Sequence, residues 1–189
     1  YHLLTSLLVP RPIGWVSSRS AAWLKNLAPF SFFAALASSP VLIGISFGAR
    51  RGSPKDTLHN IRETGAFCVN VVTEKHLHAM NASAGEHPPE VDEFAVAGVV
   101  AAESELVGAP YVQDCPAVFE CRLFDEVVLG NSGSVLIIGE VVGVRIGPEL
   151  SFVPGTYVVE PESLRPVARL GGDFYALLGE TPRLPRPSV

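Results

Sequence analysis

Charged residues and cysteines are scarce in this chain. Only 17% of its 189 residues are charged, and the net charge of −5 leaves no basic surface for nucleic acid or an anionic membrane. Three cysteines, without a Cys-x-x-Cys pair, exclude a disulfide scaffold and indicate buried, reduced thiols in a cytoplasmic protein. Neither the cysteines nor the histidines have ligand spacing, so no metal site is expected.

Long, uniformly hydrophobic runs are also missing, although 48% of the residues are hydrophobic. Residues 26–49 carry no charge, but Pro29, Pro40 and several serines interrupt them well before the roughly 18 apolar residues of a membrane helix are reached. Two buried strands joined by a turn explain this stretch better than a membrane span. The apolar composition is also consistent with a large subunit interface.

Regular strand–helix alternation and a Gly-x-Gly-x-x-Gly motif are absent, so a dinucleotide-binding α/β domain is not expected. Short strands separated by turn residues indicate one mainly β domain over residues 1–189, either an antiparallel barrel or a sandwich. The early strands are predicted at Gly14–Ser18, which pairs with Trp23–Phe33, at Val41–Phe47, buried on both faces, and at Ala66–Val72.

The strongest local signal is a long hairpin. Apolar and polar residues alternate from Ala117, the alternation slips at Phe124-Asp125 as a bulge would make it, and the strand ends at Leu129. A Gly/Asn turn over residues 130–134 then leads back through a second strand, Val135–Ile146.

Pro29 marks a place where the chain can bind a ligand. Proline cannot donate a ladder hydrogen bond, so the sequence predicts a bulge or a sheet edge there. The free amides nearby and the Ser31 hydroxyl could then bind ligand oxygens or ring nitrogens. The alternative is an ordinary aromatic core segment formed by Phe30, Phe32 and Phe33.

A helix start is predicted after the basic turn that contains Arg50-Arg51. Ser53 suits the N-cap, Pro54 the first helical position, and Gly65 the end of the helix. Unpaired N–H groups at such a start bind phosphate, and Lys55 adds positive charge. The alternative is an ordinary capped helix with a solvated basic turn.

The remaining segments carry weaker signals. Glu74–Ala82 is predicted to be helical, with His76 and His78 on its solvated surface. The acidic loop Gly85–Phe94 contains His87, which could contact a substrate or lie in solvent. Residues 169–172 form a turn, and the proline-rich tail from about residue 180 is expected to be extended.

Five motifs in this order resemble the flavin reductase-like family, which includes flavoredoxin-like proteins and the reductase components of two-component monooxygenases. The resemblance implies a Greek-key split β-barrel with a few flanking helices, acting as a homodimer with FMN, rather than FAD, at the interface. The motifs are Pro10–Ile13, Asn26–Phe33, Ser53–Ile61, Asp92–Phe94 and Arg169–Gly172.

The resemblance also implies a flavin site. The segment from Pro29 to Phe32 would border the isoalloxazine ring and ribityl chain, residues 53–57 would lie at the phosphate end, and Arg11 and the 169–172 turn would add contacts. The cofactor-binding residues expected on this basis are Arg11, Asn26, Pro29, Phe30, Ser31, Phe32, Ser53, Lys55, Asp56, Thr57, Arg169 and Gly171.

The function implied first is an NAD(P)H-dependent flavin reductase, in which hydride passes from nicotinamide to flavin. This chemistry belongs to the cofactor, which agrees with the lack of a recognisable acid–base pair. Two alternatives stay open: a flavoredoxin-like electron-transfer protein without NAD(P)H activity, and a non-catalytic FMN-binding protein. A flavin-dependent monooxygenase or an electron-transfer protein would be the partner.

Overall fold

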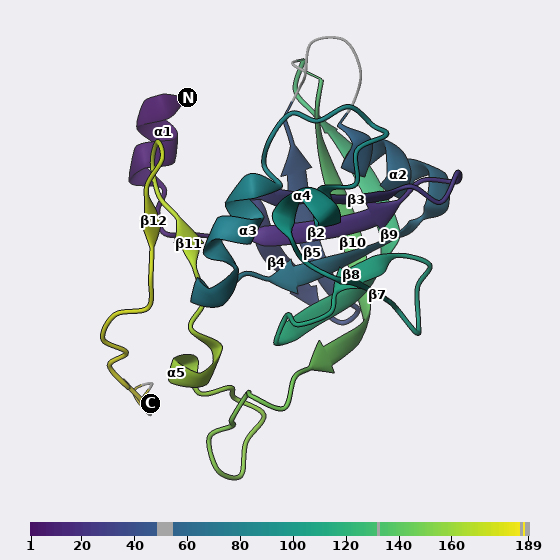
Figure 1. Ribbon diagram of the computed structural model, residues 1–189. Helices are drawn as coiled ribbons and strands as arrows, with labels where there is room; N and C mark the ends of the chain where they lie inside the picture. Colours follow the sequence, from purple (N-terminus) through teal and green to yellow (C-terminus); the bar gives the residue numbers. More distant parts are fainter. Residues whose placement is uncertain (49–54, 132, 186, 188–189) are drawn as a thin grey trace.

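The computed structural model describes residues 1–48, 55–131, 133–185 and 187 (Figure 1). Its centre is a seven-stranded, antiparallel sheet in the order β3-β2-β6-β9-β10-β5-β4. The prediction of a mainly β chain with few helices is confirmed. The sheet consists of β2 (Gly14–Arg19), β3 (Lys25–Phe30), β4 (Phe33–Ser38), β5 (Val41–Phe47), β6 (Ala66–Val71), β9 (Ala117–Leu129) and β10 (Ser134–Ile146).

The sheet curls around one of two hydrophobic clusters. Side chains from β2, β3, β5, β6, β9 and β10 meet there, and helix α2 (Asp56–Thr64) adds Leu58 and Ile61. A hydrogen bond from Ser46 N to Phe32 O, 2.9 Å long, joins β5 to the segment that follows β3. The two edges of the sheet therefore lie close together, as in a barrel.

A second cluster covers the other face of β2 and β6. Neighbouring residues of β2 take opposite sides, with Trp15 in this cluster and Val16 in the barrel. Figure 1 shows α3 and α4 in front of the sheet. The elements that cover this second cluster are η1 (Glu74–His76), α3 (Leu77–Ala82), α4 (Glu93–Ala97), β7 (Ala101–Glu103) and β8 (Pro110–Val112).

Both chain ends form an arm beside the barrel (Figure 1). Helix α1 (His2–Leu7) precedes β1 (Arg11–Pro12), which pairs with β11 (Ala168–Arg169), and β12 (Tyr175–Ala176) completes a three-stranded sheet. The short helix α5 (Pro161–Leu164) leads into this arm. The arm brings the first and last segments of the chain to the same side of the barrel.

The long hairpin is confirmed in detail. Strands β9 and β10 pair antiparallel, and their register shifts so that Asp125 lies opposite Ile138 while Leu123 lies opposite Gly139. Phe124 is therefore the extra residue of a bulge, where the alternation of the sequence breaks.

Two strand predictions need correction. The expected strand Trp23–Phe33 ends at Phe30, and Phe33 begins a separate strand, β4. The prediction of a bulge or a sheet edge at Pro29 is confirmed as an edge, because Pro29 lies opposite Trp15 in regular register on β3, an edge strand among the strands that the structure describes. Strand β5 is buried on both faces only at its centre, since Val41 is exposed.

The helix predictions also need correction. Helix α2 begins at Asp56 with Lys55 as its N-cap, later than expected, and Gly65 ends it at φ +69° as predicted. Arg50-Arg51 and Ser53-Pro54 lie outside the described residues. His78 is exposed, but His76 is buried, with its Nδ1 2.9 Å from Thr73 Oγ1, so its assignment to the surface was wrong. The acidic loop was predicted to reach Phe94, but it ends at Asp92, because α4 begins at Glu93.

The three cysteines are buried and unbridged, as expected. Burial raises the pKa of the Cys68 thiol to about 12 and raises the pKa values of Cys115 and Cys121 as well. Such thiols are poor nucleophiles near neutral pH. Among the described residues, no helix is long and apolar enough to cross a membrane.

The ring of Phe67, on β6, packs closely against Gly139, on β10, so a substitution at Gly139 tests the packing of the barrel core. A Cβ at Gly139 would lie 2.4 Å from Cζ of the buried Phe67, whereas a Cβ at Gly108 would have no heavy atom within 4 Å. We expect Gly139→Ala to lower the free energy of unfolding by about 1–3 kcal/mol because the core is overpacked. Gly108→Ala should be nearly neutral. Urea denaturation measures both, and equal effects would contradict the packing described.

Candidate functional site

Two cavities meet at Pro29 near the end of β3. The larger, about 610 Å³, lies between the arm and the barrel, and the smaller, about 240 Å³, lies at the start of α2. Pro29 and Ala84 line both. The two cavities are therefore neighbours that share part of their walls.

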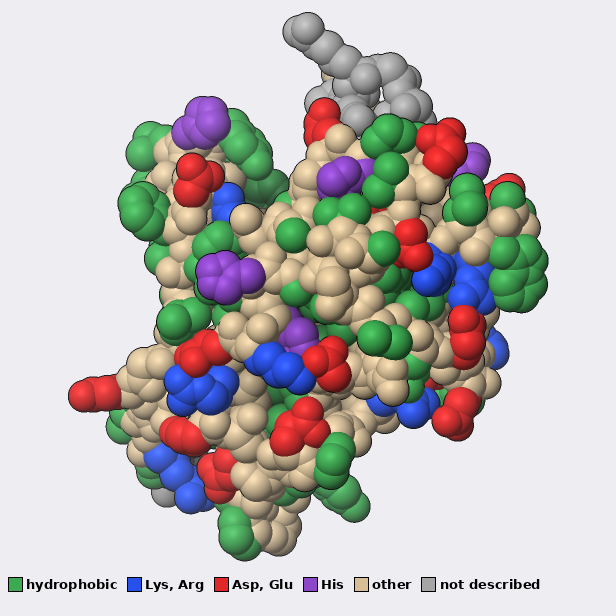
Figure 2. All heavy atoms as spheres, in the orientation of Figure 1, with side chains coloured by type: hydrophobic (Ala, Val, Ile, Leu, Met, Phe, Trp, Pro, Cys, Tyr) green, Lys and Arg blue, Asp and Glu red, His purple; other side chains and the backbone are tan. Residues whose placement is uncertain are grey.

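The larger cavity is aromatic and basic. Phe30 and Ser31 line its barrel side, and Arg11, Arg169 and Tyr175 line the side of the arm. Figure 2 shows the notch between the projecting helix α1 and the body of the molecule. The lining suits a flat, polar ring system, because arginine and aromatic side chains both stack on such rings.

Arg11 is held in place by the ends of the chain. Its guanidinium donates to the carbonyl oxygens of Thr5 (2.5 Å), Leu8 (2.7 Å) and Leu170 (2.8 Å). It thereby caps the end of α1 and ties it to the C-terminal segment. Arg11 is extended, since it lies in β1 and pairs with Arg169 of β11.

The 169–172 turn forms the opposite wall. The Arg169 guanidinium donates to the Gly172 carbonyl and lies 4.5 Å from the Tyr175 ring, whose hydroxyl donates to Asn81 Oδ1 at 3.0 Å. Gly171 lines neither cavity. A Cβ at this position would lie 2.8 Å from Ser6 Cα, so the glycine permits close contact with α1.

The smaller cavity combines a cation with a helix start. Lys55, Asp56 and Thr57 line it, and His87 lies on the opposite loop. The Lys55 ammonium is 5.0 Å from the centre of the Phe30 ring, so it lies close to the larger cavity as well. The first turn of α2 has N–H groups without helical partners, which favours an anion here.

A buried hydrogen-bond network supports the smaller cavity. Thr57 Oγ1 donates to Asn26 Oδ1 at 2.6 Å, and Asn26 Nδ2 donates to Glu93 Oε1 at 3.2 Å. The backbone N–H of Leu27 donates to the other carboxylate oxygen, also at 3.2 Å. Burial raises the pKa of Glu93, and the negative charge of Asp56 acts in the same direction. Asn26 and Thr57 thus hold the helix start to β3.

The structure brings nine of the twelve expected site residues to these two cavities. Phe32 lines neither cavity, although its ring centre is 6.0 Å from the Arg11 guanidinium. Gly171 also lines neither cavity, and its backbone packs against α1. Ser53 lies outside the described residues. The nine are Arg11, Asn26, Pro29, Phe30, Ser31, Lys55, Asp56, Thr57 and Arg169.

Sequence reasoning assigned no role in the site to two lining residues, Glu93 and Asn81. Asn81 lies in the predicted helix Glu74–Ala82, and Glu93 lies in the predicted acidic loop. Glu93 carried a signal, since Asp92 begins a short helix by accepting a hydrogen bond from Phe94 N.

Two buried side-chain nitrogens without hydrogen-bond partners bear on whether a flavin would fit these cavities. Arg11 Nε and His87 Nε2 are inaccessible and make no hydrogen bond with the described residues, and their residues line the larger and the smaller cavity respectively. Cations and hydrogen-bond donors at two linked cavities fit a ligand with a polar ring at one end and an anion at the other. The described residues contain no cluster of three or more His, Cys, Asp or Glu side chains suited to a metal ion.

The fold and the two neighbouring cavities define a class: a β-barrel protein with one cavity lined by aromatic and guanidinium groups and a second at a helix start. The flavin reductase like domain model matches residues 6–160. The chain therefore belongs to the flavin reductase-like family, whose structures include flavin-binding proteins.

Individual relatives agree with this assignment. An uncharacterized protein of Halalkalibacterium halodurans is 39% identical over 100% of this chain and 91% of its own length. Nitrilotriacetate monooxygenase component B of Bacillus cereus is 34% identical with a TM-score of 0.91, covering 97% of this chain and 92% of that one. A split-barrel protein of Shewanella frigidimarina (21% identity, TM-score 0.86, covering 98% and 91%) shares the fold, so the predicted split β-barrel is confirmed.

The raised pKa of Glu93 predicts a specific pH dependence of stability. In the unfolded chain a glutamate loses its proton near its ordinary pKa of about 4.3, whereas folded Glu93 keeps its proton to a higher pH. Between these two pKa values, the free energy of unfolding therefore falls as pH rises. Glutamine does not titrate. The free energy of unfolding of the wild type relative to Glu93→Gln should therefore fall as pH rises above the ordinary pKa of glutamate.

Glu103 provides a control of opposite sign. Its hydrogen bond from Arg19 lowers its pKa, so its contribution is complete above the ordinary value and is lost only as pH falls below it. The free energy of unfolding of the wild type relative to Glu103→Gln should stay constant over the pH range in which the value relative to Glu93→Gln falls. Denaturation at a series of pH values measures both, and a flat Glu93 profile would contradict the prediction.

Proposed function

We propose that this protein is an FMN-binding flavin reductase that takes electrons from NADH or NADPH. The observation that supports it most is the meeting of the two cavities at Pro29, with the Lys55 ammonium above the Phe30 ring between them. One cavity suits a flat ring and the other an anion. FMN carries both within one molecule.

The phosphate would bind at the smaller cavity. Lys55 would supply the charge, the first turn of α2 its backbone N–H groups, and His87 a further ring nitrogen. We propose FMN rather than FAD because the charged end of the site is also its smaller end.

The isoalloxazine ring would bind in the larger cavity. Phe30 at the end of β3 and the following residue, Ser31, would border it on one side, and Arg11, Arg169 and Tyr175 would border it from the arm. A bound flavin supplies hydride and electron transfer chemistry. The contribution of the chain is to orient the ring and limit the access of water, which requires no acid–base pair.

The partner would be a flavin-dependent monooxygenase in the cytoplasm. Component B of nitrilotriacetate monooxygenase, at 34% identity, is one component of such a system by its name, and this supports the proposal. The alternative partner is an electron-transfer protein that donates to the flavin in place of a nicotinamide. The two alternatives differ in the donor that reduces the bound flavin.

The protein would act as a homodimer. Strand β4 is exposed along most of its length, with Leu36 47% exposed, and the far end of β9 exposes Phe124 (53%) and Val128 (64%). Helix α1 is apolar and exposed too, with Leu3 and Leu7 both at 73%. Surfaces of this kind mark interaction sites, and a second copy of the chain would cover them beside the flavin.

The proposed activity is tested by visible absorption of the protein saturated with FMN, without oxygen. NADH or NADPH should bleach the flavin absorption, and steady-state assays should show flavin-dependent oxidation of the nucleotide. Bleaching by a ferredoxin-type donor alone would instead show an electron-transfer protein, and no bleaching by any donor a non-catalytic one. If the protein does not bind FMN at all, the flavin proposal is wrong.

Two equally exposed valines test the dimer. Val128 lies on the apolar end of β9 (64% exposed), and Val100 lies outside this surface (62% exposed). Val128→Glu should weaken self-association by about tenfold or more because it buries an unpaired charge. Val100→Glu should leave it unchanged. Sedimentation velocity over a concentration series measures both, and a wild type that stays monomeric would overturn the dimer.

A further inference from the structure

Glu93 is a buried carboxylic acid at the floor of the smaller cavity. Only 5% of it is exposed, although it is the first residue of α4 and lies among surface loops. Buried carboxylates are costly unless both oxygens are hydrogen-bonded. The partners of this carboxylate therefore indicate why it is there.

Both oxygens bind donors from β3. Oε1 accepts from the side-chain amide of Asn26, and Oε2 accepts from the backbone N–H of Leu27, both at 3.2 Å. Only a carboxylate offers two acceptor atoms at this position, since one end of a glutamine amide would face a donor with its own N–H groups. Glu93 therefore fixes the strand and the direction of the Asn26 amide together.

The direction of that amide decides what Asn26 can do on its other side. Because Nδ2 faces Glu93, Oδ1 points the other way, and it accepts from Thr57 Oγ1 of α2 at 2.6 Å and from Ser18 Oγ of β2 at 3.3 Å. Asn60, one turn further along α2, donates to Ser18 Oγ at 3.1 Å. The start of α2 is thus tied to Glu93 through side chains that are all buried.

We propose that Glu93 is a positioning residue for the phosphate end of the flavin, acting through Asn26 on Thr57 and the first turn of α2. The inference rests on the proposed flavin site. A carboxylate beside a phosphate is electrostatically unfavourable, and Asp56 lines the same cavity. The two donors that Glu93 holds, rather than its charge, account for its presence.

The test compares two ligands that differ only in the phosphate. Affinities of the full-length protein for FMN and riboflavin are measured by quenching of flavin fluorescence. For Glu93→Gln we expect the preference for FMN over riboflavin to fall by about tenfold, the size of one lost hydrogen bond to a charged group. Riboflavin affinity should change little, because the residues around the ring are not altered.

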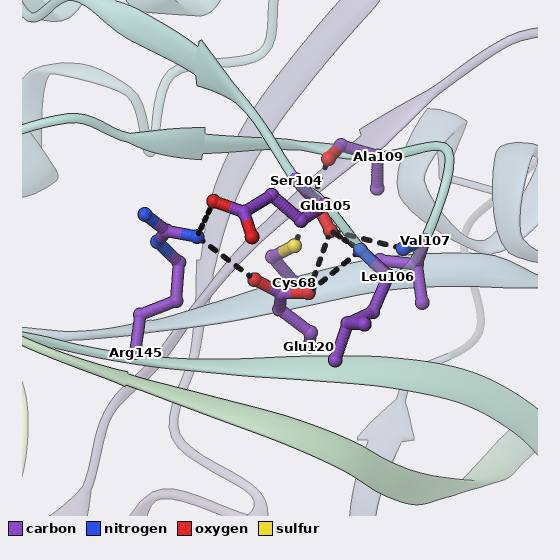
Figure 3. A network of polar contacts seen from close by, with 8 residues as sticks. All are labelled: Cys68, Ser104, Glu105, Leu106, Val107, Ala109, Glu120 and Arg145. Atoms are coloured by element: carbon purple, nitrogen blue, oxygen red, sulfur yellow. Dashed lines mark hydrogen bonds and ion pairs between the residues drawn. The ribbon is translucent and has the colours of Figure 1, made fainter.

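Glu120 provides the matched control (Figure 3). It is 2% exposed and accepts from Ser104 Oγ at 2.8 Å and from Leu106 N at 3.1 Å, and it lines neither cavity. Figure 3 shows it beneath the loop that follows β7, with Arg145 at its other side. Glu120→Gln should reduce stability as Glu93→Gln does and leave the FMN preference unchanged.

Thr57→Val tests the route through Asn26 without changing Glu93. It should reduce the FMN preference as well, and the double variant with Glu93→Gln should lose no more than the larger single effect. An unchanged preference in both single variants, or an equal loss in Glu120→Gln, would overturn the inference while the flavin site stands. A wild type with no preference for FMN overturns it too, and one that binds neither flavin overturns the proposed function with it.

Discussion

The candidate site depends on how the free edge of β3 is satisfied. Among the residues that the structure describes, this strand pairs only with β2, and a buried strand edge needs partners for its outward N–H groups. Glu93 provides one by accepting from Leu27, and its other oxygen holds Asn26. The edge can therefore lie under α4, and the end of β3 is left to border both cavities.

In the proposed flavin complex, the two cavities would bind different parts of one ligand. Near the arm, the lining is aromatic and guanidinium-bearing, whereas the start of α2 offers a lysine and backbone N–H groups. Strand pairing and the hydrogen bonds from Arg11 to carbonyl oxygens near both chain ends hold the arm together. In the proposed flavin reductase the cofactor would carry the reaction, so the chain would need to position it more than to supply titrating groups. The buried thiols, with their raised pKa values, agree with this proposal.

The apolar composition has its explanation in the exposed surfaces rather than in the barrel core alone. The barrel and the cluster outside it account for the buried hydrophobic residues, but β4, the far end of β9 and helix α1 present further apolar side chains to solvent. These surfaces lie on the parts of the chain that a second copy would cover in the proposed dimer. The same copy would lie next to the arm that borders the larger cavity.

The sequence alone determined the features that depend on neighbouring residues. Alternation predicted the β9–β10 hairpin and its bulge at Phe124, and Gly65 marked the end of α2, because strand faces and left-handed turns are local properties. The family motifs identified nine of the residues that line the cavities. Only the tertiary structure decided that β3 stops at Phe30, that His76 is buried, and that Glu93 binds Asn26, 67 residues away. Such contacts form between surfaces that only the complete fold brings together, so no local pattern records them.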